Sequence, residues 1–209
     1  MTRKKSFLIP ALKILVWGGA LIPLGILLTL YFSGALLLVD PVEEIQVRTG
    51  ISVLILLFLT LSITPLRSLT GWNKLVRFRR LLGTFAFFYA TLHAFSYFVF
   101  DQALSFMAIV EDVIEHPWVL AGFSAFLLLI PLALTSTTGS IRRLGGKRWR
   151  RLHALVYPIA MLGVLHFYWL VKKDASEPII YALILAAILG ARLLVWKKSK
   201  IRSTQSAAP

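Results

Sequence analysis

The chain has 209 residues, 58% of them hydrophobic, and a formal net charge of +14. Its apolar runs come near the roughly 20 residues that cross a bilayer, which excludes an ordinary soluble enzyme and predicts a membrane protein. The basic residues lie mainly in the loops between apolar runs and near the termini, so the positive charge reflects membrane topology. Nucleic acid is therefore excluded as a partner. We expect a single all-α domain over residues 1–209, a bundle of six transmembrane helices.

The six expected spans separate the charges into two sets. The spans cover about residues 9–32, 47–66, 81–100, 117–137, 152–171 and 178–196. All nine Asp and Glu fall in or beside the loops after the first, third and fifth spans, whereas 18 of the 23 Lys and Arg fall at the other membrane side. Lys and Arg are retained in the cytoplasm during insertion, so both termini are predicted to be cytoplasmic. Lys13 and Arg192, near inner ends, are expected to snorkel.

The third and fifth spans each carry a histidine in an apolar, aromatic stretch. An ionisable side chain inside a membrane is costly and usually has a partner, and imidazole is well suited to bind haem iron. Both spans run from cytoplasm to exterior, and His93 and His166 come 12 and 14 residues after Leu81 and Leu152. At about 1.5 Å per residue, both lie roughly 18–21 Å from the inner boundary. We therefore predict that they bind one haem iron from opposite sides, in the outer half of the membrane.

Two further features bear on this haem site. Ala90 and Gly163 each precede a histidine by three residues, and Gly83 and Ala86 extend the stripe; such small residues make room for a macrocycle or simply let helices pack closely. The sequence has no cysteine. This absence excludes c-type attachment, thiolate ligation and iron–sulfur clusters, so a b-type haem with histidine ligands is expected.

The inner end of the fifth span carries His153, whose role the spacing leaves open. It lies about 140° around a straight helix from His166, although Pro158 between them could kink the helix. His153 is therefore a ligand of a second, inner haem, a hydrogen-bonding group of a quinone site, or an interfacial residue. The basic residues at the inner ends of the two histidine spans could bind haem carboxylates or an anionic headgroup; they are Arg79, Arg80, Arg150 and Arg151.

A fourth histidine, His116, belongs to an expected outer loop. An exposed loop histidine is most often a solvated polar residue, and the functional alternative is a contact with a partner.

Four segments together resemble the MsrQ (YedZ) family, the haem-binding membrane subunits of periplasmic methionine sulfoxide reductase systems and part of the ferric-reductase-like transmembrane group. They are SITPLRSLTGWN, FRRLLGTFAFFYATLHAF, LALTSTTGSIRRLGGKRWRRLH and RWRRLHALVYPIAMLGVLHFYWLVKK. The resemblance covers nearly the whole chain, including its length and six spans.

The resemblance implies an electron carrier in the bacterial inner membrane. Its donor would be quinol or a cytoplasmic flavin reductase, and its acceptor a periplasmic molybdopterin-containing reductase. The family's haem-associated histidines fall on His93, His153 and His166. Eukaryotic relatives carry a second histidine on the third span where this chain has Arg79 or Arg80, so one haem is expected and a second is in question. FMN is associated with the family, but no residue pattern here locates it.

Three rival functions remain. The chain could serve another periplasmic or metal-reducing oxidoreductase as its haem subunit. A self-contained ferric reductase needs a flavin and nicotinamide domain, yet the sequence has no G-x-G-x-x-G motif. A transporter lines a water-filled path with polar groups, and the apolar surroundings of His93 offer few.

Overall fold

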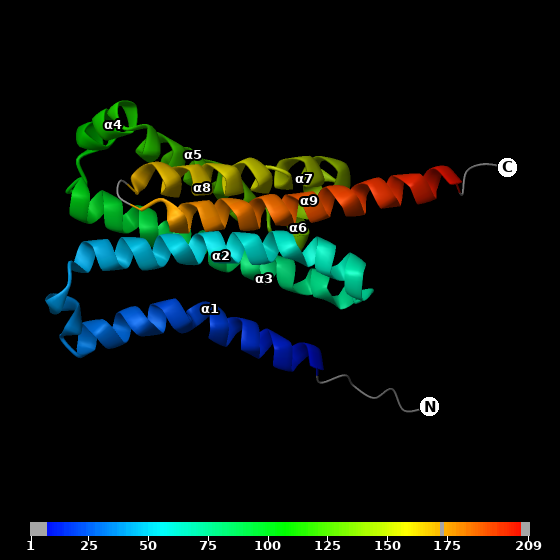
Figure 1. Cartoon of the computed structure of the whole chain (residues 1–209), viewed down its shortest axis with the longest axis horizontal. Helices are drawn as coiled ribbons and strands as arrows, with labels where there is room; N and C mark the ends of the chain where they lie inside the picture. The colour runs from blue at the N-terminus through cyan, green and yellow to red at the C-terminus, as the bar shows by residue number, and fades with distance from the viewer. Residues whose placement is uncertain (1–7, 172–173, 206–209) are drawn as a thin grey trace.

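The computed structural model describes residues 8–171 and 174–205, and all regular structure within them is helical. Six segments of the described chain are helices long and apolar enough to cross a membrane, as expected. Their main helices are α1 (Leu8–Phe32), α2 (Pro41–Thr70), α3 (Val76–Ser96), α5 (Pro117–Leu134), α8 (Val156–Leu170) and α9 (Ser176–Gln205). They run side by side, α1 begins at the end of the bundle where α9 finishes, and α9 projects beyond its neighbours there (Figure 1).

Three shorter helices lie at the ends of the bundle. Helix α4 (Phe106–Glu115) lies at one end, opposite to the end at which α1 begins (Figure 1). Helices α6 (Thr138–Leu144) and α7 (Gly146–His153) form the connection between α5 and α8. The backbone also makes 3₁₀ turns at Ala35–Leu38 and Asn73–Leu75, and a π-helical turn at Tyr97–Asp101 that continues α3.

The chain bends between α7 and α8 at Ala154 and Leu155. Proline has no backbone N–H, and its ring clashes with the carbonyl four residues earlier, which for Pro158 is that of Ala154. The Ala154 carbonyl accepts instead from Tyr157 N, at 3.1 Å, in a tighter turn. The expected fifth span is therefore divided into α7, which ends at His153, and α8, which carries His166.

Both ends of α2 follow from local sequence. Asp40 caps its start by accepting hydrogen bonds from Val42 N and Glu43 N at 2.9 and 3.1 Å, with Pro41 as the first helical residue. Gly71 ends it with a φ of 69°, a conformation that glycine adopts without steric cost. The helix extends past the expected span, residues 47–66, at both ends.

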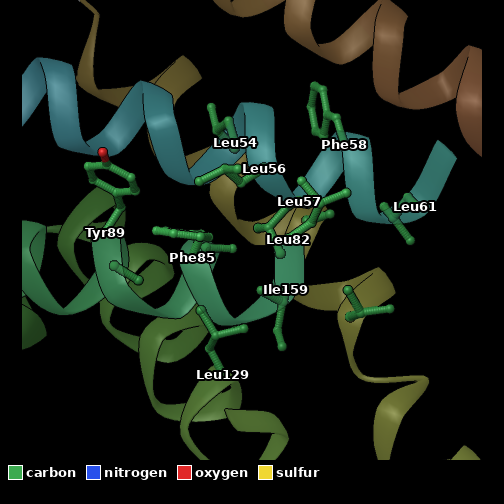
Figure 2. Close-up of a cluster of buried hydrophobic side chains, with 14 of the residues drawn as sticks. Leu54, Leu56, Leu57, Phe58, Leu61, Leu82, Phe85, Tyr89, Leu129 and Ile159 are labelled. Carbon is green, nitrogen blue, oxygen red and sulfur yellow. The ribbon is translucent and has the colours of Figure 1, made fainter. Parts of the chain in front are cut away.

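The buried core joins four helices. Helix α2 packs most extensively on α3, and α5 packs most extensively on α8, with fewer contacts between the two pairs. Figure 2 shows Leu56 and Leu57 of α2 on the side of Leu82 and Phe85 of α3, with Leu129 of α5 and Ile159 of α8 beside them. Phe58 points to the other side of α2, toward Tyr181 of α9. These four helices form the frame of the site described below.

Helix α1 is attached to this frame by a tyrosine hydroxyl. Tyr89 of α3 is completely buried; its hydroxyl donates to Ala20 O at 2.6 Å and accepts from Leu24 N at 3.3 Å. Ala20 and Leu24 are four residues apart and would bond to each other in an uninterrupted helix. The hydroxyl therefore sits inside the hydrogen-bond ladder of α1, next to the helix-weakening Pro23.

Candidate haem site

His93 of α3 and His166 of α8 face a common cavity of about 880 Å³ between α2, α3, α5 and α8. Their ring centres are 6.0 Å apart and their planes are nearly perpendicular, at 82°. Two imidazoles on opposite sides of one iron would have ring centres roughly 6 Å apart, because each metal–nitrogen bond is about 2 Å and each ring nitrogen is about 1 Å from the ring centre. The separation suits a shared metal ion.

Backbone carbonyls orient both imidazoles. His93 Nδ1 lies 3.0 Å from Gln46 O of α2, and His166 Nδ1 lies 2.7 Å from Trp118 O of α5. A carbonyl oxygen can only accept, so Nδ1 carries the proton in each ring and the lone pair is on Nε2. Metal-bound histidines generally donate their other ring N–H to such an acceptor. Both rings are therefore held in the tautomer that a metal ligand needs.

A threonine adds a second acceptor beside His93. Thr49 is almost fully buried, and its hydroxyl lies 3.4 Å from His93 Nδ1 and 2.6 Å from Ile45 O. Since the hydroxyl donates to Ile45 O, it faces His93 with a lone pair. His93 and His166 thus differ in their surroundings, with two acceptors around one Nδ1 and one around the other.

Two glycines that the sequence analysis missed lie against the imidazoles. A Cβ at Gly122 of α5 would come within 2.7 Å of His166 Nδ1, and a Cβ at Gly50 of α2 within 3.2 Å of His93 Cε1. Each glycine lies four residues after the carbonyl that accepts from the same imidazole, so it shares a helical face with that carbonyl's residue. The sequence signal that could have pointed to these two positions is a glycine inside an otherwise apolar helix.

The small residues singled out from the sequence have different surroundings. Ala90 and Gly163 line the cavity. Ala86 is fully buried in the core beside it, whereas a Cβ at Gly83 would meet nothing within 4 Å. The expected stripe therefore contributes two residues to the cavity.

The cavity has a polar mouth under α4. Asp112 of α4 accepts from Tyr97 Oη and Gln102 Nε2, and its other oxygen lies 2.7 Å from His116 Nδ1. Tyr97, Asp112 and His116 all line the cavity, so His116 is not merely a loop residue in solvent. Asp101, also at the mouth, accepts from Gln46 Nε2. Asp101 and Asp112 are thus engaged in hydrogen bonds within the bundle.

His153 and the four candidate arginines lie away from this cavity. His153 Nε2 is 3.0 Å from Thr135 Oγ1, and its ring stacks on Trp149 with centres 3.9 Å apart. Arg79 is half-buried and lies near His153. The other three side chains are exposed: Arg80, Arg150 and Arg151. The structure thus separates the sequence-predicted residues into a histidine pair at the cavity and a basic group away from it.

Proteins named methionine sulfoxide reductase heme-binding subunit MsrQ match almost the whole chain. One from Xanthomonas axonopodis pv. citri is 50% identical over 206 residues, 96% of this chain and 93% of its own length. One from Herminiimonas arsenicoxydans is 47% identical over 190 residues, 90% of this chain and 87% of its own length. The chain belongs to the MsrQ family.

The match to the MsrQ family agrees with a broader one. Residues 48–164 match the ferric reductase like transmembrane component; this range contains His93 and most of α2, α3, α5 and α8, and ends two residues before His166. With its six spanning helices, this MsrQ family member is a multi-pass protein of the bacterial inner membrane. No solved structure matches the chain.

The residues of the cavity fit haem better than a bare metal ion. No group of three or more His, Asp or Glu in the described part of the chain could hold a metal ion, whereas a haem iron needs only two axial ligands from the protein. The cavity volume falls within the range of about 300–1,000 Å³ of cofactor sites. The Nε2 atoms of His93 and His166 would hold the haem iron.

Proposed function

We propose that this chain is a transmembrane b-type cytochrome. In this proposal it takes electrons from quinol or a cytoplasmic flavin reductase and passes them to a periplasmic molybdopterin-containing methionine sulfoxide reductase, which repairs oxidised proteins. The observation that carries the proposal is the pair of facing imidazoles, His93 and His166, whose Nδ1 atoms are both held by backbone carbonyls. The names of the MsrQ relatives support the haem and the reductase system.

Different residues of the cavity have different roles in holding the cofactor. Haem b, when bound, supplies a one-electron couple between ferric and ferrous iron. His93 and His166 provide Nε2 ligands from helices of two different packed pairs, and Gln46 O and Trp118 O fix the ring orientations. The apolar walls formed by Ala90, Leu129 and their neighbours exclude water from the macrocycle. The sequence has no cysteine for covalent c-type attachment, so we assign the haem as b-type.

We further propose that both termini are cytoplasmic and that the polar mouth opens to the periplasm. The distribution of Lys and Arg supports this orientation. It places electron exit at α4 and electron uptake at the end that carries His153. The hydrogen bond between His153 and Thr135 favours a hydrogen-bonding role over ligation of a second haem, because it occupies Nε2. We therefore assign one haem; FMN, which the family resemblance implies, would be detected by flavin fluorescence of the purified protein.

Haem spectra of three histidine variants test the proposal. His93→Ala and His166→Ala in detergent-purified protein should each lose most bound haem, or the low-spin spectrum of a six-coordinate iron, because each removes one axial ligand. His153→Ala is the matched control and should keep the wild-type haem-to-protein ratio. Wild-type spectra in both cavity variants would refute the assignment, and loss of half the haem in His153→Ala would show that a second haem is present.

A further inference from the structure

Arg192 is held inside the bundle near the end where α9 projects. We expected this side chain to snorkel, but its guanidinium donates to Leu61 O of α2 at 2.6 Å and to Tyr157 Oη of α8 at 2.6 and 3.1 Å. It also lies over the Tyr157 ring, 5.1 Å from its centre. These partners are all neutral. They fix the position of the cation between α2, α8 and α9 without balancing its charge.

Two more arginines lie close to this cation. Arg79 of α3 is within electrostatic reach of Arg192, Arg67 and Tyr157. No carboxylate is among the groups that act on Arg79. Among the described residues, the close contacts between a basic side chain and a carboxylate are Arg48 with Glu44 and His116 with Asp112, and neither involves Arg67, Arg79 or Arg192. Three like charges from three helices are therefore brought together without an anion from the described chain.

Two of these arginines lie close to helix ends or to a basic segment. Arg192 precedes Lys197 by five residues, about 7.5 Å of helix, and Arg67 lies three residues before the end of α2. Leu66 and Leu69 of α2 are exposed next to Arg67, as are Leu193 and Trp196 next to Arg192. Tryptophan is typical of the membrane interface, and apolar side chains there contact acyl chains. An anion reaching the arginines from this side would have an apolar surface for its tail.

We propose that Arg67, Arg79 and Arg192, with the Tyr157 hydroxyl, bind the phosphate group of an anionic phospholipid of the cytoplasmic leaflet. Arginine binds phosphate oxygens through paired N–H donors, and basic pockets between transmembrane helices on the cytoplasmic side bind anionic headgroups. The lipid phosphate supplies the missing negative charge and joins α2, α3 and α9 at their inner ends. The assignment to the cytoplasmic leaflet rests on the orientation proposed above, whereas the binding of a phosphate by these arginines does not.

Native mass spectrometry of the full-length, haem-loaded protein tests this site. Protein delipidated in neutral detergent is titrated with phosphatidylglycerol and, in parallel, with phosphatidylcholine. Wild type should bind one phosphatidylglycerol more tightly than phosphatidylcholine, and Arg67→Gln and Arg79→Gln should each weaken that binding by about fivefold. Arg77→Gln is the matched control, since it removes an exposed arginine of α3 outside the cluster and should bind as wild type does.

Two readouts distinguish the proposal from its alternatives. Arg67 is exposed, so Arg67→Gln should fold even if Arg79→Gln or Arg192→Gln does not, and the haem-to-protein ratio reports folding in every sample. Displacement of the lipid by millimolar inorganic phosphate would support the same anion site but identify free phosphate as its ligand. Equal affinity for the two lipids, or equal binding by Arg67→Gln and Arg77→Gln, would overturn the proposal. The proposal would also be overturned if Arg79→Gln lost half of the bound haem and kept wild-type lipid binding, because Arg79 would then serve a second haem.

Discussion

Gly122 and Gly50 leave little space between their helices and the two imidazoles. A methyl group at Gly122 would collide with a ring nitrogen that is already fixed by the Trp118 carbonyl, so the ring cannot turn away without losing that bond. We expect Gly122→Ala to lower haem affinity by about tenfold or more, in line with the loss of an outer-shell partner of a metal ligand. Gly50→Ala should have a smaller effect, because its closest approach is 3.2 Å.

Haem titration of the apoprotein, followed by the Soret band, measures both effects. Gly83→Ala is the matched control, since it adds the same methyl group on the helix that carries His93 and meets nothing within 4 Å. If Gly122→Ala binds haem as tightly as Gly83→Ala does, the close approach has no functional meaning.

The histidine pair was predictable from sequence, whereas its supports were not. Counting residues from the inner ends of two parallel spans placed His93 and His166 at matched depth, and the structure brings their rings together. Gly50, Gly122 and Thr49 lie on other helices, so their role depends on which helices pack together. A single sequence contains no direct signal of that pairing. The acceptors Gln46 O and Trp118 O are backbone atoms, which side-chain patterns do not reveal.

At the scale of the helix, the Tyr89 hydroxyl connects α1 to α3 at a weak point of α1. Tyr89→Phe removes this connection while keeping the ring, and Leu24 N can then bond to Ala20 O within α1. We therefore expect a loss of about 1 kcal/mol in stability, the net value of a typical hydrogen bond, and easier separation of α1 from the bundle. Thermal unfolding in detergent and protease cleavage before α2 measure these effects. Tyr31→Phe, at an exposed position of α1, should change neither.

Asp112 fastens α4 over the mouth of the cavity. Its carboxylate receives hydrogen bonds from Tyr97 and Gln102 and pairs with His116, so Asp112→Ala removes three contacts at once. We expect faster hydrogen exchange of the amides of Phe106–Glu115, whereas Glu111→Ala, one residue earlier and exposed, should leave exchange near wild type. Unchanged exchange in Asp112→Ala would mean that packing alone holds α4.

The helices differ in how well their sequence predicts them. The six spans follow from apolar length, and the bend between α7 and α8 from the clash between Pro158 and the Ala154 carbonyl. Helix α4 was not expected, because a segment of ten residues with three acids resembles an outer loop. It packs on α5, and Asp112 connects it to Tyr97 at the end of α3, contacts that depend on the tertiary fold.

At the scale of the whole molecule, the acids near α4 form two sets, those that bond within the bundle and those that remain exposed. Asp101 and Asp112 are engaged at the cavity mouth, and Glu111 and Glu115 remain exposed on α4. If a basic periplasmic reductase docks there, reduced protein in outside-exposed vesicles should reoxidise on addition of that reductase and its sulfoxide substrate, and more slowly as salt rises. Replacing both Glu111 and Glu115 by Gln should slow the step several-fold at low salt.

Glu177→Gln, in the first turn of α9, shows whether the effect is specific to α4, because Glu177 is also exposed. Reoxidation by a cytoplasmic acceptor alone would instead reverse the proposed direction of electron flow.

Each imidazole is oriented by the helix that packs most extensively on its own: α2 orients His93 and α5 orients His166. During synthesis, α2 and α3 emerge before α5 and α8, so the first half can position its ligand before the second half exists. A chain that stops early would then offer only one axial nitrogen and retain haem poorly. Haem would therefore be retained by chains whose translation and insertion are complete. Proteases that degrade haem-free protein would leave those complete chains intact.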